Sequence, residues 1–355
     1  MPSLFDPLFI NTLELNNRFF RSATLDILGY QGMVTDSLLS FYGELARGGI
    51  GLIFTGGVFP KREGQLGRGQ LGAHSDETIP GLKRLVRVVH ESEGKIAAQL
   101  MHSGWLCSPE VTGFQPEGPT SFVNNRGHQV RKLFEDEVYE IVELFVQAGR
   151  RVIEAGFDAV QIHGAHSHLI SSFLSPAINT RKDEWGGSPE NRAKLLIQIY
   201  RGLRKLAGDA YPILIKYGLL DYHPKGKSLS EGLDVASSLE VEGIDAIEVS
   251  EGFEEERVHH IRLGAISPYY VSECRLAREV LSLPLILVGG MRSLQEMQAV
   301  LDEGVADGIS MCRPFIMDPH IILTFRDGSA TESKCISCNE CLEKAKEGDI
   351  SCTNK

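Results

Sequence analysis

The sequence predicts an α/β fold in which eight parallel strands alternate with helices and close into a (β/α)8 TIM barrel. One pattern recurs four times: a helix-like stretch ends in glycine, and a short apolar strand with an acidic or small residue near its start follows. These copies lie at residues 48–55, 156–163, 243–250 and 304–311. Four further short apolar runs lie at residues 19–24, 95–100, 212–216 and 284–288. Since no strand is followed by GxGxxG, a doubly wound open sheet is the weaker alternative.

Segments with helical periodicity fill the intervals between the strands. They span residues 36–47, 76–91, 135–154, 189–206, 230–240 and 294–302. Residues 9–15 cross a turn-like Asn11-Thr12 pair and predict a short hairpin that closes the barrel floor. The insertion at 103–133 is rich in Gly, Pro and Asn, which predicts a lid. We expect residues 1–328 to form the barrel and residues 329–355 a Cys-rich extension.

Composition restricts the surroundings and the partners of the protein. Of its 355 residues 42% are hydrophobic and 23% are charged, and no apolar run approaches the roughly 20 residues of a membrane span. A formal net charge of -11 disfavours nucleic acid, whose phosphates require clustered Lys and Arg. Residues 1–17 lack the basic and apolar regions of a signal peptide. We therefore expect a cytoplasmic protein that acts on a small-molecule substrate, without a membrane or nucleic-acid partner. We also expect a homo-oligomer, although no feature of the composition determines the number of subunits.

Reactive side chains in such a barrel are expected where the strands end. In chain order these exits carry Ser22, Ala23, Thr24, Gly57, Gln99, His102, His163, His166, His168, Lys216, Gly289, Gly290, Cys312 and Arg313. The loops after the last two strands commonly bind phosphate, because Gly lets backbone N–H groups approach the anion and Arg supplies charge. Gly289-Gly290 alone would indicate a tight turn, but beside Arg313 it predicts a phosphorylated ligand. The acidic residues 251–256 either rim the mouth or form a solvated loop.

Several motifs together resemble the old yellow enzyme family of FMN-dependent oxidoreductases. They are Gln99, His163-x-x-His166, the block from Ser171-Ser-Phe-Leu-Ser-Pro to Gly186-Gly-Ser-Pro-Glu-Asn-Arg192, Cys312-Arg313-Pro314, and Leu4-Phe5-Asp6-Pro7 with Leu15-Asn-Asn-Arg18. The resemblance covers essentially the whole chain. It implies an ene-reductase that takes electrons from NAD(P)H and binds FMN non-covalently across the barrel mouth. The implied FMN contacts are the phosphate ligands Gly289, Gly290, Cys312 and Arg313, and the ring neighbours Ser22, Ala23, Thr24, Gly57, Gln99 and Lys216.

The resemblance also implies roles for Lys216 and the three histidines. Lys216 would lie near N1 and the C2 carbonyl of the flavin, where reduction places negative charge. A salt-bridge partner is the alternative for this Lys, but a cation that ends a buried strand needs a nearby anion, and a flavin would supply one. His163 and His166 would bind the carbonyl oxygen of an activated alkene. His168 stands where many members have a proton-donating Tyr, and imidazole can also donate a proton.

Two other interpretations of the histidines follow from the residue types alone. A histidine pair can simply pack a loop. The cluster of His163, His166 and His168 also resembles the metal sites of barrel hydrolases, and a metal-dependent hydrolase is therefore the alternative function.

Four of the seven cysteines lie near the C-terminus, as Cys335-x-x-Cys338-x-x-Cys341 followed by Cys352. Thiolates at such spacings can surround a [4Fe-4S] cluster. The arrangement resembles the motif that follows the barrel in 2,4-dienoyl-CoA reductase and trimethylamine dehydrogenase, whose further flavin and nucleotide domains we expect this chain to lack. A cluster here would serve an electron-transfer partner or have a structural role. Tetrahedral Zn2+ and free thiols are the alternatives.

Overall fold

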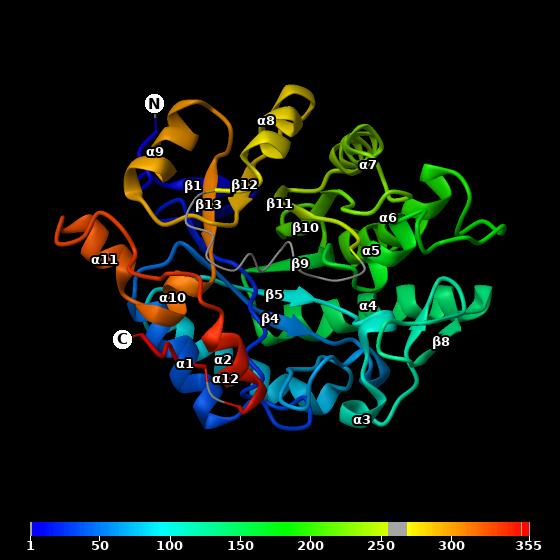
Figure 1. Cartoon of the computed structure of the whole chain (residues 1–355). Coiled ribbons are helices and arrows are strands. Elements are labelled where there is room, and N and C mark those ends of the chain that lie inside the picture. The colour runs from blue at the N-terminus through cyan, green and yellow to red at the C-terminus, as the bar shows by residue number, and fades with distance from the viewer. Residues whose placement is uncertain (1, 255–267, 349, 355) are drawn as a thin grey trace.

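Eight parallel strands close into a barrel in this computed structural model, which describes residues 2–254, 268–348 and 350–354 (Figure 1). The strand order around the barrel is β10-β11-β12-β13-β3-β4-β5-β9. The strands are β3 (Phe19–Arg21), β4 (Leu52–Val58), β5 (Ile96–Leu100), β9 (Ala159–Gly164), β10 (Ile213–Leu220), β11 (Ala246–Glu251), β12 (Leu285–Val288) and β13 (Gly308–Met311). The predicted TIM barrel and its eight strands are confirmed.

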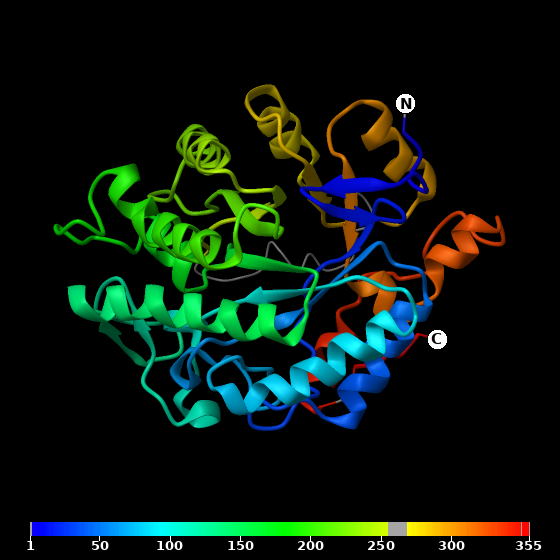
Figure 2. The same cartoon turned by 180° about the vertical axis from the view of Figure 1, so that it is seen from behind.

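The main helices lie outside the barrel and connect its strands (Figures 1 and 2). They are α1 (Asp36–Arg47), α2 (Ile79–His90), α4 (Glu135–Ala155), α6 (Pro189–Ala207), α7 (Leu229–Glu242), α8 (Val271–Val280) and α9 (Leu294–Asp302). The hydroxyl of Ser188 caps α6 by accepting the Asn191 N–H at 3.3 Å. Gly156 and Gly243 end α4 and α7 with φ of +91° and +96°, a conformation that disfavours other residues. The recurring glycine therefore marks the turn from helix to strand.

A hairpin closes the amino-terminal end of the barrel. Strands β1 (Leu8–Ile10) and β2 (Leu13–Leu15) pair antiparallel around the Asn11-Thr12 turn, as predicted. The alternating apolar residues of the hairpin pack on side chains from the barrel interior, among them Phe20, Phe54 and Ile286. Apolar side chains therefore fill the amino-terminal end of the barrel, and a functional site is expected at the carboxyl ends of the strands.

The insertion after β5 folds as a small separate layer. It contains η3 (Gly104–Leu106), α3 (Pro109–Thr112) and a three-stranded sheet of β6 (Glu117–Gly118), β8 (Gln129–Lys132) and β7 (Phe122–Val123). Glu117 is buried between His102 (3.2 Å), Lys61 (2.7 Å) and Arg131 (2.8 Å). Burial on its own raises the pKa of Glu117, but His102 and Lys61 lower it to about 2. This ion cluster holds the insertion on the barrel, while its role as a lid stays a prediction.

The C-terminal segment folds back onto the ends of β12 and β13. It follows α10 (Arg313–Met317) and α11 (Ile321–Arg326) and includes α12 (Glu340–Lys346). Arg292 donates to the Cys335 carbonyl and to the Ser337 hydroxyl, and Arg313 donates to Asn339 Oδ1 at 2.7 Å. The Cys-rich extension therefore contacts the barrel mouth directly. No helix in the described part of the chain combines the length and apolarity needed to cross a bilayer.

Candidate functional site

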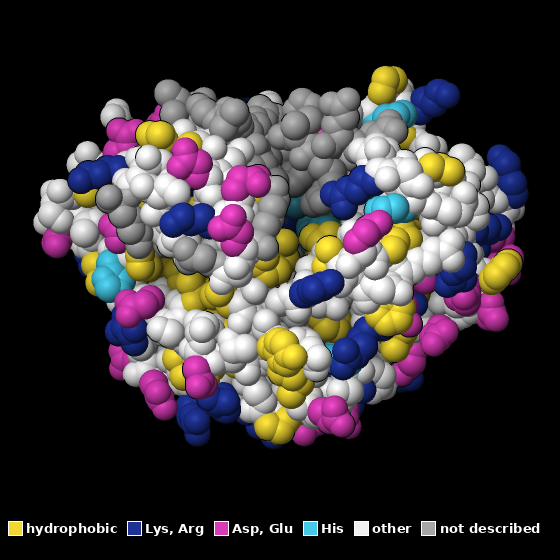
Figure 3. Space-filling view, turned by 60° about the horizontal axis from the view of Figure 1, so that its bottom comes forward, with side chains coloured by type: hydrophobic (Ala, Val, Ile, Leu, Met, Phe, Trp, Pro, Cys, Tyr) yellow, Lys and Arg dark blue, Asp and Glu magenta, His cyan; other side chains and the backbone are white. Residues whose placement is uncertain are grey.

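A cavity of about 650 Å³ lies at the carboxyl ends of the barrel strands. Figure 3 looks onto this part of the molecule, where apolar side chains gather around a hollow. The cavity is lined by every residue predicted to contact FMN and by the three histidines: Ser22, Ala23, Thr24, Gly57, Gln99, His163, His166, His168, Lys216, Gly289, Gly290, Cys312 and Arg313. The fold thus brings these residues together from all parts of the chain, and their individual roles stay predictions.

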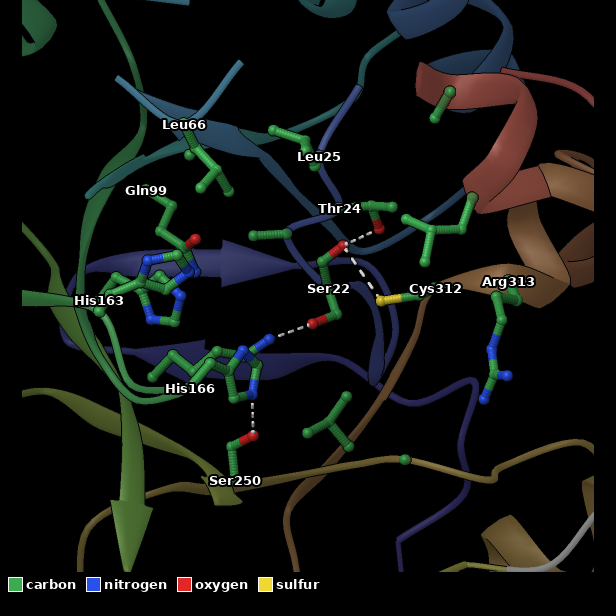
Figure 4. Close-up of a pocket in the computed structure, with 18 of the residues that line it drawn as sticks. Ser22, Thr24, Leu25, Leu66, Gln99, His163, His166, Ser250, Cys312 and Arg313 are labelled. Atoms are coloured by element: carbon green, nitrogen blue, oxygen red, sulfur yellow. Dashed lines mark hydrogen bonds between the residues drawn. The ribbon is translucent and has the colours of Figure 1, made fainter. Parts of the chain in front are cut away.

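The histidines expected to bind substrate and the residues expected to bind phosphate lie at opposite ends of the cavity. In Figure 4, His163 and His166 stand on one side, Cys312 and Arg313 on the other, and Ser22 lies between them. Ser22 bonds to both neighbourhoods, since its hydroxyl accepts from Lys216 Nζ at 2.6 Å and its carbonyl lies 3.7 Å from Cys312 Sγ. An elongated ligand with one phosphate and one polar ring would match this separation of groups.

A buried acid, Glu248 of β11, pairs with Lys216 at 3.4 Å. Both side chains are almost fully buried, with exposed fractions of 0% and 3%. The adjacent strand therefore supplies an anion for Lys216, as in the salt-bridge alternative, while a role of Lys216 beside the flavin stays a prediction. Glu248 was not predicted from the sequence, although an acid inside the apolar run 246–249 was a usable signal.

Gln99 is held by a second buried amide. Its Nε2 donates to Gln161 Oε1 at 2.7 Å, and Gln161 Nε2 donates in turn to Glu248 Oε2 at 2.8 Å. Gln161 and Glu248 do not line the cavity, whereas Gln99 does. The amide of Gln99 is therefore oriented from beneath before any ligand arrives.

The three histidines leave β9 on a tight turn. The rings of His163 and His166 meet edge to face with centroids 5.2 Å apart, and His163 and His168 are 4.7 Å apart. His166 has φ of +57°, a left-handed conformation, and its Nε2 lies 2.7 Å from Ser250 Oγ. His168 then occupies the N-cap position of α5 (Leu169–Leu174), without a capping bond from its side chain. Ser250 thus orients one imidazole of a compact group that faces the cavity.

The other end of the cavity combines glycines with arginines. Gly289 and Gly290 have φ of +103° and +77°, and a Cβ on Gly289 would lie 2.3 Å from the Tyr269 ring. Arg292 follows them and is buried, which lowers its pKa, and it lines the cavity together with Arg313. Arg292 is a second cation at the predicted phosphate end that the sequence interpretation did not select.

The four C-terminal cysteines surround a second, smaller cavity. Cys335, Cys338, Cys341 and Cys352 line it together with Arg313, and Cys341 also lines the large cavity. Burial raises the pKa of Cys341, and the neighbouring Cys335 adds to this effect. A metal cation bound among the thiols would offset this rise in pKa, because thiols that bind a metal ion do so as thiolates. In the described part of the chain, however, no three His, Cys, Asp or Glu side chains are arranged closely enough to hold a metal ion.

One histidine and one acidic stretch differ from their expected placement. His102 does not line the cavity; it accepts from the Gly104 N–H at 3.0 Å and turns to Glu117 of the insertion. The acidic stretch is not a solvated loop in its described part, because Glu251 and Glu254 are buried, with Glu251 Oε2 accepting from Tyr270 at 2.9 Å. Residues 255 and 256 lie outside the described residues.

The comparisons with known proteins agree with this geometry. The family model for the NADH:flavin oxidoreductase / NADH oxidase family matches residues 3–332. A metal reductase of Desulforamulus reducens is 33% identical over 348 residues, which cover 97% of this chain and 52% of the relative. An NADPH dehydrogenase of Bacillus subtilis is 31% identical, with 90% of this chain and 93% of the relative covered. A 2-naphthoyl-CoA reductase complex has a TM-score of 0.93 at 26% identity, covering 98% of this chain and 56% of that chain.

These matches decide between the interpretations of the cavity. The chain spans about half the length of the curated relatives it matches first. An old yellow enzyme homologue from Zymomonas mobilis also shares the fold, with a TM-score of 0.80 at 26% identity over 95% of this chain and 96% of that chain. The metal-dependent hydrolase is not supported, and the resemblance to flavin oxidoreductases is confirmed. The chain belongs to the NADH:flavin oxidoreductase / NADH oxidase family.

Proposed function

We propose that the protein binds FMN non-covalently and uses NAD(P)H to reduce a carbon–carbon double bond conjugated to a carbonyl group. One observation carries the proposal: the residues expected to contact phosphate, flavin ring and substrate all line a single cavity. Its volume of about 650 Å³ is within the range of roughly 300–1,000 Å³ that is typical of small-molecule sites.

The residues present fit FMN. Gly289 and Gly290 turn their backbone with positive φ beside Arg313, which suits a phosphate. Lys216 supplies a buried cation about the polar edge of the ring, and Gln99 offers donor and acceptor groups there. Ser22, Ala23, Thr24 and Gly57 would border the ring. When bound, FMN supplies the hydride chemistry that connects NAD(P)H to the substrate.

The histidines would act on the substrate. His163 and His166 would donate hydrogen bonds to the carbonyl oxygen, which makes the β-carbon more electrophilic. The contact of His166 with Ser250 fixes the ring that does this. His168 would deliver the proton to the α-carbon. The apolar wall of Leu25, Leu66, Trp105 and Leu106 excludes water and suits an apolar substrate body.

The C-terminal thiols extend the proposal. A [4Fe-4S] cluster held by Cys335, Cys338, Cys341 and Cys352 would serve an outside electron partner or stabilise the segment. The four thiols line one small cavity, although within the described residues they do not approach one another closely enough for a single metal ion. A cytoplasmic location and homo-oligomeric assembly also belong to the proposal. Light scattering of the purified protein measures the assembly.

One experiment tests the function. The protein is purified without oxygen, its visible spectrum and its FMN, iron and acid-labile sulfide contents are measured, and enones, dienoyl thioesters and nitroalkenes are then offered with NADH or NADPH. The proposal requires a yellow protein that bleaches on reduction and turns over at least one of these alkenes. Colourless protein that does not acquire FMN on reconstitution contradicts it, and stoichiometric FMN with almost no iron removes the cluster alone.

A further inference from the structure

We propose that Glu248, which is buried beside the cavity but does not line it, is a positioning residue that sets the reduction potential of the flavin. The proposal rests on the FMN site described above. Glu248 is fully buried on β11. Its carboxylate contacts side chains that lie on or next to four other strands, namely Ser22, Gln161, Lys216 and Ser310. Oε1 accepts from Ser22 Oγ at 2.6 Å and from Ser310 Oγ at 2.8 Å, and Oε2 accepts from Gln161 at 2.8 Å.

The carboxylate fixes the direction of every bond around it, because an ionised acid can only accept. The single hydroxyl proton of Ser22 is used toward Glu248, so Ser22 Oγ is left to accept from Lys216 Nζ at 2.6 Å. Gln161 must likewise turn its NH2 toward Glu248. Its carbonyl oxygen then accepts from Gln99 at 2.7 Å.

Glu248 therefore orients three groups that line the cavity, Ser22, Lys216 and Gln99, without lining it itself. The arrangement differs from an isolated structural salt bridge. A carboxylate that only balanced the charge of Lys216 would need no further partner. Glu248 also orients the Ser22 hydroxyl and, through Gln161, the Gln99 amide of the cavity. Such buried networks are effective only when every member is satisfied.

The charge of Glu248 also opposes that of Lys216, 3.4 Å away. Reduced flavin carries more negative charge near N1 and the C2 carbonyl than oxidised flavin does, so Lys216 favours the reduced form. Glu248 weakens this preference because it offsets part of the positive charge. The pair thus holds the potential lower than Lys216 alone would.

The test is the midpoint potential of bound FMN in Glu248→Gln, measured by spectroelectrochemical titration. With the charge removed and the shape kept, reduced FMN should be favoured over oxidised FMN at least tenfold more than in the wild type, which is about 30 mV for a two-electron couple. Asp221→Asn is the matched control, because Asp221 is also a buried acid at the barrel exits but does not line the cavity or contact Lys216. Its potential should stay at the wild-type value.

An unchanged or lowered potential in folded, FMN-loaded Glu248→Gln overturns the proposal, as does an equal shift in the control. If the single variant does not fold, the same substitution is made beside Lys216→Met, where no buried charge is left unpaired. The double variant must then have a higher potential than Lys216→Met alone, and any other result overturns the proposal. Wild-type protein that binds no FMN refutes the proposed function instead, so the two failures are distinguishable.

Discussion

Glu117→Gln should loosen the insertion, which contributes residues such as Trp105 and Asn124 to the cavity lining. Glu117 is almost completely buried and contacts Lys61 and His102 of the barrel and Arg131 of the insertion. Its pKa falls from 4.5 to about 2, against the effect of burial, mainly through His102 and Lys61. Since one pKa unit corresponds to about 1.4 kcal/mol, the ionised carboxylate contributes on the order of 3 kcal/mol, equivalent to roughly 100-fold in the population of the open insertion.

The pH dependence follows from the sign of this shift. A carboxyl whose pKa is lowered by folding adds stability above its unfolded pKa of 4.5, and this contribution disappears as the pH falls toward 2. Burial lowers the pKa of His102, so below pH 6.5 the exposed imidazole binds a proton more readily than the buried one does. Protonation of His102 therefore also favours opening of the insertion. Both groups therefore make the insertion weaker in acid.

Hydrogen exchange of the backbone amides in β8 measures the opening. At pH 7 we expect exchange in Glu117→Gln to be up to roughly 100-fold faster than in the wild type, and the difference to shrink between pH 4.5 and 2. Glu137→Gln is the control, because Glu137 also binds Arg131, at 2.7 Å, but is partly exposed and does not contact the barrel cluster. Equal exchange of Glu117→Gln and wild type at pH 7 would refute the reasoning.

Three further results are expected. Arg313→Ala should weaken FMN binding by roughly 1.5–3 kcal/mol through loss of a charge-assisted bond, measured by equilibrium dialysis, whereas the exposed Arg326→Ala should not. His168→Phe should slow oxidation of reduced flavin by an enone in stopped-flow experiments but leave reduction by NAD(P)H unchanged; equal slowing of both half-reactions would show that His168 holds the flavin or the fold. Gly289→Ala should lose FMN on gel filtration, because its Cβ would lie 2.3 Å from the Tyr269 ring at a φ of +103°, and retention of flavin would exclude a role for this turn.

The sequence alone was sufficient for the barrel and for most of the predicted cavity residues, although it misplaced His102 and did not select Arg292. The strands were predictable because buried parallel strands are continuous apolar runs, and the glycines before them are required by backbone conformation. The cavity residues were predictable because parallel strands place all their carboxyl ends at one face, whatever their separation in the chain. The residues predicted to contact FMN and the three histidines therefore line one cavity, from Ser22 to Arg313.

Only the tertiary structure decided which side chains pair within that cavity. Lys216 and Glu248 are register partners on β10 and β11, and His163 is the partner of Lys216 on β9. The register of parallel strands is set by closure of the barrel, and a shift of one residue would turn every side chain to the opposite face. The sequence could therefore indicate that Lys216 needs an anion, but not that a neighbouring strand presents a carboxylate at the same level. The contact between His102 and Glu117 could not be predicted for a similar reason. Glu117 belongs to the insertion, and no local sequence pattern indicates where the insertion packs on the barrel.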